Sequence, residues 1–160
     1  VGAYCGKANI MKMVSPDGEV YQAGTLSGNP VAMAAGIAQL GECLREGFYE
    51  DLARKTSGFA GAVNGHAQKK GYAVKMFFIG SIFWLAFTGR DNIKKASEID
   101  PAGMEKFKLL HGGLLDRSVY LGPSGYEVGF VSQAHNAADL NLAASAIISV
   151  LDCIFREQKK

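Results

Sequence analysis

The sequence is poor in cysteine, histidine, proline and tryptophan. Its 160 residues include three cysteines, three histidines, four prolines and one tryptophan. Cys5, Cys43 and Cys153 are odd in number, widely separated and free of C-x-x-C spacing, so they indicate neither a disulfide framework nor a zinc site. We expect no metal, and we expect a reducing, cytoplasmic setting.

Strong charge of one sign and long apolar runs are also missing. Charged residues make up 20% of the chain and the formal net charge is +2, which gives no basic field for phosphate backbones or anionic lipid. The longest apolar run, residues 76–87, is broken by Gly80 and Ser81 and is shorter than the ~20 residues of a membrane helix. Neither nucleic acid nor a membrane is therefore expected as a partner.

What is present is the composition of a globular protein. Hydrophobic residues make up 48% of the chain, and a chain of roughly 150 residues can bury about two thirds of its unfolded surface. The first residue is Val1 rather than Met, and the opening VGAYCGKANI reads as the middle of a longer sequence. We expect a fragment or a processed chain.

The clearest local signal is Asn29-Pro30, which predicts a helix over residues 30–46. Asparagine is a favoured N-cap, and proline fits the first helical position because its missing N–H costs nothing there. The apolar stripe of this helix is rich in small residues, which suggests close packing against another body. A second helix is expected over residues 48–70.

Two more helices are predicted in the second half of the chain. Asp100-Pro101 repeats the cap-then-proline signal and begins a helix that runs to about Asp116. Asn136 with Asp139 three residues later is the acidic form of a capping box. It opens a final helix that ends near Phe155.

Strands are predicted between these helices. Residues 72–78 and 81–88 are rich in aromatic and β-branched side chains, and shorter extended segments are expected at residues 118–121 and 127–131. The strands and helices do not follow a strict βαβ order, so we predict an α+β domain over residues 48–160. Residues 1–47 are expected to form a strand, a loop and a long helix that belong to a neighbouring body.

The loop Gly24-Thr-Leu-Ser-Gly-Asn-Pro30 has features of a phosphate-binding loop. Small residues allow backbone amides to approach an anion, a threonine hydroxyl can donate to it, and a capped helix begins just beyond. From the residues alone, the alternative of a plain loop with a helix cap stays open.

Three segments resemble the glutamate-1-semialdehyde 2,1-aminomutase family in order and spacing. They are VYQAGTLSGNPVAMAAG at residues 20–36, HGGLLDRSVYLGPSGYEVGF at residues 111–130, and VSQAHNAADL at residues 131–140. With the opening VGAY, the resemblance covers essentially the whole chain and identifies it as the C-terminal part of such an enzyme.

The resemblance implies a fold-type I pyridoxal-phosphate enzyme that works as a homodimer. Residues 48–160 would be its C-terminal small domain and residues 1–47 the end of its large cofactor-binding domain. The cofactor would be pyridoxal 5'-phosphate or pyridoxamine 5'-phosphate, and the Schiff-base lysine would lie eight residues before Val1. The full-length enzyme would convert glutamate 1-semialdehyde to 5-aminolevulinate in tetrapyrrole synthesis, whereas this chain alone would be inactive.

The resemblance also assigns three site residues. Gly24 and Thr25 would reach across the dimer interface to the phosphate bound by the other subunit. Glu127 would bind an amino group of a diamine intermediate by a charge-assisted hydrogen bond, although from the residues alone it could be a surface acid on a short strand. The related ω-aminotransferases carry an Arg-Phe-x-Pro motif in this region to hold a substrate carboxylate, and YEVGF at residues 126–130 contains no arginine.

Departures from the family pattern leave two other functions open. Cys5 and Lys7 replace the more common glycine and arginine, and Gly125-Tyr126 replaces a Gln-Phe pair. One alternative is an ω-amino-acid aminotransferase that uses a separate keto acid. The other is a non-catalytic module for folding and dimerisation, produced as a fragment or as half of a split protein.

Overall fold

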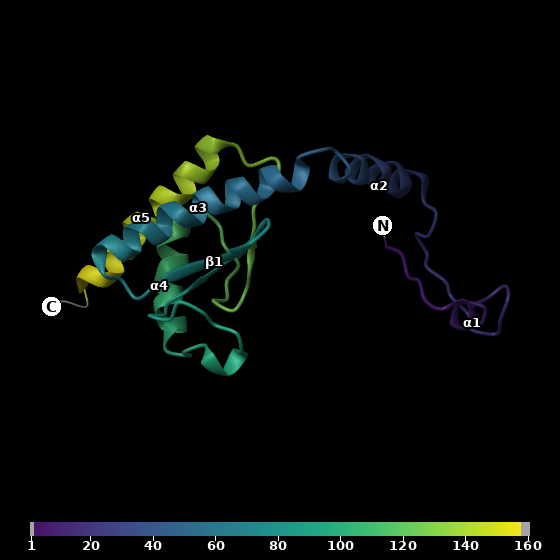
Figure 1. Cartoon of the computed structure of the whole chain (residues 1–160), viewed down its shortest axis with the longest axis horizontal. Coiled ribbons are helices and arrows are strands. Elements are labelled where there is room, and N and C mark those ends of the chain that lie inside the picture. Colours follow the sequence, from purple (N-terminus) through teal and green to yellow (C-terminus); the bar gives the residue numbers. More distant parts are fainter. Residues whose placement is uncertain (1, 158–160) are drawn as a thin grey trace. The chain divides into compact units, whose positions relative to one another are not determined.

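The computed structural model describes residues 2–157 and divides the chain into two compact units (Figure 1). Unit 1 is Val1–Phe48 and unit 2 is Tyr49–Lys160. The boundary lies one residue beyond the position expected from the sequence. That unit 1 is the end of a larger cofactor-binding domain stays a prediction.

Unit 1 contains the short helix α1 (Ala8–Met11) and the longer helix α2 (Pro30–Cys43). The strand expected near the start of the chain is not formed among the described residues. A single parallel bridge between Val14 and Val20 stands in its place. A strand needs a partner for its backbone groups, and this segment instead folds back on itself, because the Val20 amide donates to the Met13 carbonyl at 2.8 Å.

Helix α2 begins as the sequence predicts. The Asn29 side chain accepts a hydrogen bond from the Ala32 amide at 3.1 Å, and Pro30 occupies the first turn. The helix ends at Cys43 rather than near residue 46, and none of its residues is buried.

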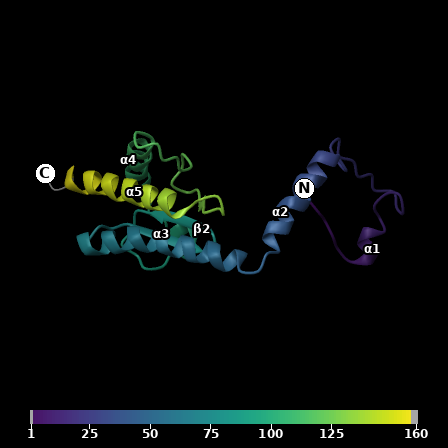
Figure 2. The same ribbon diagram turned by 90° about the horizontal axis from the view of Figure 1, so that it is seen from above.

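Unit 2 is built from three helices, a 3-10 turn and a small sheet. In chain order these are α3 (Phe48–Lys70, which begins at the boundary), β1 (Lys75–Ile79), β2 (Ile82–Ala86), η1 (Ala96–Glu98), α4 (Gly103–Leu115), β3 (Gly129–Phe130) and α5 (Ala137–Glu157). The strands form one antiparallel sheet in the order β1-β2-β3, and the three helices gather around it (Figure 2). The α+β class predicted from the sequence is confirmed.

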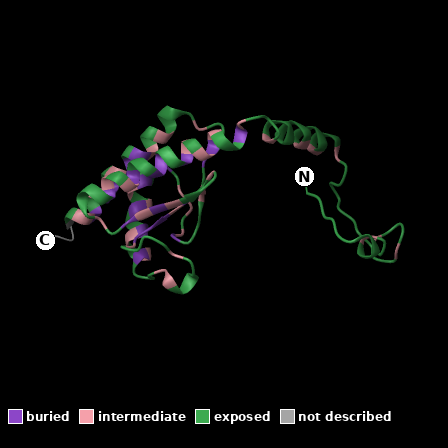
Figure 3. Ribbon diagram, viewed as in Figure 1, coloured by how far each residue is buried: buried purple, intermediate pink, exposed green. Residues whose placement is uncertain are grey.

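The core lies entirely within unit 2. Apart from Phe48, every buried residue among those described falls between residues 52 and 154 (Figure 3). The largest fully buried side chains come from all three helices and β1: Thr56, Val63, Met76, Leu110, Leu114, Ile147 and Leu151. This core fixes the sheet and the loops that follow it.

The strand predicted at residues 118–121 is wrong, because the end of α4 uses these residues. The Ser118 amide donates to Leu115 and the Val119 amide to Leu114, and Ser118 has a left-handed φ of 58°. Such bonds satisfy the last carbonyl groups of a helix. The segment predicted at 127–131 does form β3, but only over two residues.

The expectation that the chain contains no segment with the character of a membrane span is wrong for helix α5. By length and composition alone, Ala137–Arg156 could cross a membrane. In the structure, Ile147, Val150 and Leu151 are buried in the core of unit 2. About 33% of this apolar stretch is buried inside unit 2, where α5 packs against α4.

Candidate functional site

The loop that contains Gly24 and Thr25 forms two successive turns before α2. The Ser27 amide donates to the Gly24 carbonyl at 2.9 Å, and the Asn29 amide donates to the Leu26 carbonyl at 3.1 Å. A Cβ on Gly24 would collide with the Ser27 hydroxyl, so a larger residue at this position would force the Ser27 side chain to move.

Several donor groups of this loop are not used by hydrogen bonds within the described residues. Thr25 is exposed, and within the described residues its amide, its hydroxyl and the Leu26 amide have no hydrogen-bond partner. Three free donors on a glycine-containing turn beside a helix start can hold a phosphate group. The loop therefore fits the phosphate-side role that the resemblance assigns to it.

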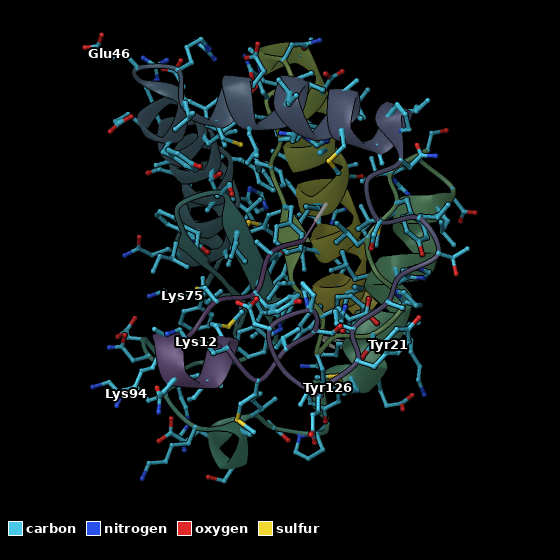
Figure 4. The ribbon with its side chains drawn as sticks, turned by 90° about the vertical axis from the view of Figure 1, so that its right-hand side faces the viewer. Lys12, Tyr21, Glu46, Lys75, Lys94 and Tyr126 are labelled. Atoms are coloured by element: carbon cyan, nitrogen blue, oxygen red, sulfur yellow. The ribbon has the colours of Figure 1, made fainter. Side chains whose placement is uncertain are left out.

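Glu127 lies in unit 2 and is the last residue of a turn formed by residues 124–127. Its amide donates to the Ser124 carbonyl at 3.0 Å, and the neighbouring Tyr126, labelled in Figure 4, is exposed. A Cβ on Gly122 would collide with the Glu127 carboxylate, so this carboxylate lies across the backbone of Gly122. It has no hydrogen-bond or ion-pair partner within residues 2–157.

Glu127 borders a cavity of about 530 Å³ between the sheet, the inner face of α5 and the 118–131 segment. The ionisable side chains along it are Tyr120, Glu127, His135 and Asp139, and most of the remaining wall is apolar: Phe59, Phe83, Phe107, Leu121, Leu142 and Ile147. A cavity of several hundred cubic ångströms with a few polar groups is typical of small-molecule sites. The arrangement suits an amine held at the rim by Glu127.

His135 and Lys55 hold the loop on the far side of this cavity. The His135 Nδ1 atom accepts a hydrogen bond from the Ser132 amide at 2.9 Å. Lys55 donates to the carbonyl groups of Gln133 and His135 at 3.1 and 2.8 Å. His135 is therefore a loop-capping residue.

A second polar cluster, which the sequence analysis missed, joins α3 to α5. The Asp152 Oδ1 atom lies 2.8 Å from His66 Nε2 and accepts a hydrogen bond from the Tyr72 hydroxyl at 2.9 Å. The bond with His66 lowers the pKa of Asp152, partial burial opposes this, and the Tyr72 bond adds to the lowering. The hydrogen bond to Asp152 in turn raises the pKa of Tyr72.

The three predicted site residues are divided between the units. Gly24 and Thr25 share one turn in unit 1, whereas Glu127 lies on the cavity of unit 2. Their roles toward a cofactor and a substrate stay predictions. Within residues 2–157, no group of three or more His, Cys, Asp or Glu residues is arranged to hold a metal ion.

No model of a known protein family matches the sequence, but solved structures match the fold. An omega-transaminase from Sphaerobacter thermophilus superposes with a TM-score of 0.77 and 19% identity over 94% of this chain. The fold is that of the C-terminal part of a transaminase.

Two further transaminase structures agree. A transaminase with PLP bound gives a TM-score of 0.75, 22% identity and 97% coverage of this chain. A β-phenylalanine aminotransferase from Variovorax paradoxus gives 0.76, 24% and 92%. This chain covers 34%, 35% and 34% of the three structures, in the order given. It thus spans about a third of the transaminase chains that it matches.

Proposed function

We propose that the chain is the C-terminal part of a pyridoxal-phosphate enzyme, glutamate-1-semialdehyde 2,1-aminomutase. The observation that carries the proposal is the transaminase fold over more than nine tenths of the chain, together with the aminomutase-like segments at residues 20–36 and 111–140. The whole enzyme would convert glutamate 1-semialdehyde to 5-aminolevulinate in the cytoplasm.

The phosphate of the cofactor would be held by the loop at Gly24 and Thr25. The amides of Thr25 and Leu26 and the Thr25 hydroxyl are the donors available for it. As in the family, this loop would serve the cofactor of the partner subunit, so that a homodimer is required. When bound, pyridoxal phosphate supplies an electron sink for carbanion chemistry.

Glu127 would hold an amino group of the substrate. Its carboxylate has no partner in the described part of unit 2 and lies at the rim of the cavity, where a charge-assisted hydrogen bond to an ammonium group is favourable. The YEVGF segment around it lacks the arginine that would bind a keto-acid carboxylate. This supports transfer of nitrogen within one substrate rather than between two.

The test is a chimera in which this chain replaces the C-terminal third of a known glutamate-1-semialdehyde aminomutase. We expect 5-aminolevulinate to form from the semialdehyde without any added keto acid. Glu127→Gln should lower kcat/KM at least tenfold, because about 1.5–3 kcal/mol of charged hydrogen bonding is lost. Glu46→Gln changes an exposed acid of unit 1 and should leave turnover unchanged.

Two outcomes would contradict the proposal in different ways. An absolute requirement for a keto acid would favour the ω-amino-acid aminotransferase instead. A folded chimera that binds the cofactor but turns over neither glutamate 1-semialdehyde nor an ω-amino acid would favour a non-catalytic module for folding and dimerisation. The exposed apolar side chains of unit 1 also suit such a module.

A further inference from the structure

The turn that ends at Glu127 is tied to the sheet by one side chain. The indole Nε1 of Trp84, on β2, donates a hydrogen bond to the Gly125 carbonyl at 2.8 Å, across 41 positions of sequence. Trp84 is only half-buried. Its one polar side-chain atom is bonded to the turn that carries Glu127.

Packing favours glycine at two positions just before Glu127, namely Gly122 and Gly125. Gly125 is buried, and a Cβ there would crowd Met104 and Phe107 of α4 at 2.7 and 3.0 Å. A Cβ on Gly122 would collide with the Glu127 carboxylate. The turn is thus held against α4 at Gly125, and Gly122 leaves room for the carboxylate.

Trp84 is held in the sheet by its backbone pairing, and its ring also stacks on its strand partner. Phe77 of β1 is paired with Trp84 in the sheet register, and the two rings stack with centroids 5.6 Å apart and an interplanar angle of 23°. The donor atom therefore sits on a rigid part of the sheet, and its bond transmits the position of the sheet to the turn.

We propose that Trp84 is a positioning residue for Glu127: through the Gly125 carbonyl it fixes the turn that lays the carboxylate over Gly122 at the rim of the cavity. The structure gives the position of the carboxylate. Any effect of that position on catalysis rests on the proposed function. Trp84 is not among the residues that line the cavity, and its hydrogen bond goes to Gly125, so its effect on Glu127 passes through the turn.

Trp84 is the only tryptophan in the chain, so its N–H can be removed alone. Growth of a tryptophan auxotroph on β-(3-benzothienyl)alanine replaces the indole N–H by sulfur and keeps the shape of the ring. We expect the amide resonances of Gly125 and Glu127 to shift, and the Glu127 amide to exchange with solvent about five- to tenfold faster, as the loss of one net hydrogen bond implies. The thermal unfolding midpoint should change little.

Phe77→Leu is the matched control. It removes the stacking but keeps the donor, so it should lower the unfolding midpoint and leave the Glu127 amide close to its wild-type exchange rate. Gly122→Ala should move the Glu127 side-chain carboxyl resonance and leave the Gly125 amide in place.

The proposal is overturned if the benzothienyl chain keeps the wild-type resonances and exchange rate at Glu127. Trp84 would then be a packing residue only. These measurements need neither cofactor nor substrate, so their result is separate from that of the chimera. An inactive chimera would leave Trp84 as the anchor of the turn, and an unchanged Glu127 amide would leave the aminomutase proposal standing.

Discussion

Single side chains in unit 2 join segments that are remote in the sequence. His66 and Asp152 are 86 positions apart and Lys55 and His135 are 80 apart, and no motif links either pair. Such contacts depend on how α3 lies beside α5, which sequence patterns do not report. Thr25 could be proposed as a site residue from its glycine-containing loop as well as from the family-like segment, whereas the proposal for Glu127 rests on the family-like segment.

The Asp152 cluster should make the stability of unit 2 sensitive to acid. Because its partners lower the pKa of Asp152 in the folded state, the stabilisation is fully present above the unfolded pKa of about 3.9 and is lost as the pH falls through the folded value. Asp152→Asn should lower the free energy of unfolding by about 2 kcal/mol at pH 7, and less at pH 3. Urea unfolding at both pH values measures this, and an equal loss at both would contradict it.

At the scale of whole elements, the sequence predicted the start of a helix correctly where a nearby side chain hydrogen-bonds to the first backbone amides of that helix. Two of the three predicted caps formed: Asn29 at α2, and the reciprocal pair of Asn136 and Asp139 at α5. The third was wrong, because the Asp100 side chain accepts from the Ala102 amide and α4 begins only at Gly103, without a side-chain cap. The prediction at residues 118–121 failed because the end of α4 took up the backbone groups that a strand would have used. β-branched and aromatic composition cannot reveal such competition.

The cap of α5 gives a prediction for an element. The Asn136 Oδ1 atom accepts bonds from the Ala138 and Asp139 amides at 2.7 and 3.0 Å. Asn136→Ala should lower the free energy of unfolding of unit 2 by about 1 kcal/mol, measured by chemical denaturation. Gln133→Ala keeps the Lys55 bond, which goes to a backbone carbonyl, and should have a smaller effect. Equal losses in the two variants would argue against a capping role.

For the molecule as a whole, the contrast between the two units is the main feature. Unit 2 encloses a core, whereas unit 1 leaves large apolar side chains in contact with solvent, including Tyr21 at 83% and Leu44 at 86% exposure. We propose that this apolar surface is an interface with another body. It agrees with a chain that spans about a third of the transaminases whose fold it shares.

We propose that this chain binds the phosphate of the cofactor and the amino group of the substrate. The lysine that anchors the cofactor would belong to the part of the enzyme that precedes this segment. The most direct measurement is borohydride reduction of the chimera with pyridoxal phosphate, followed by peptide mapping by mass spectrometry. We predict a single phosphopyridoxyl-lysine in the segment before Val1, and no stoichiometric adduct when residues 1–160 are treated alone. A stoichiometric adduct at one lysine within residues 1–160 would contradict the account.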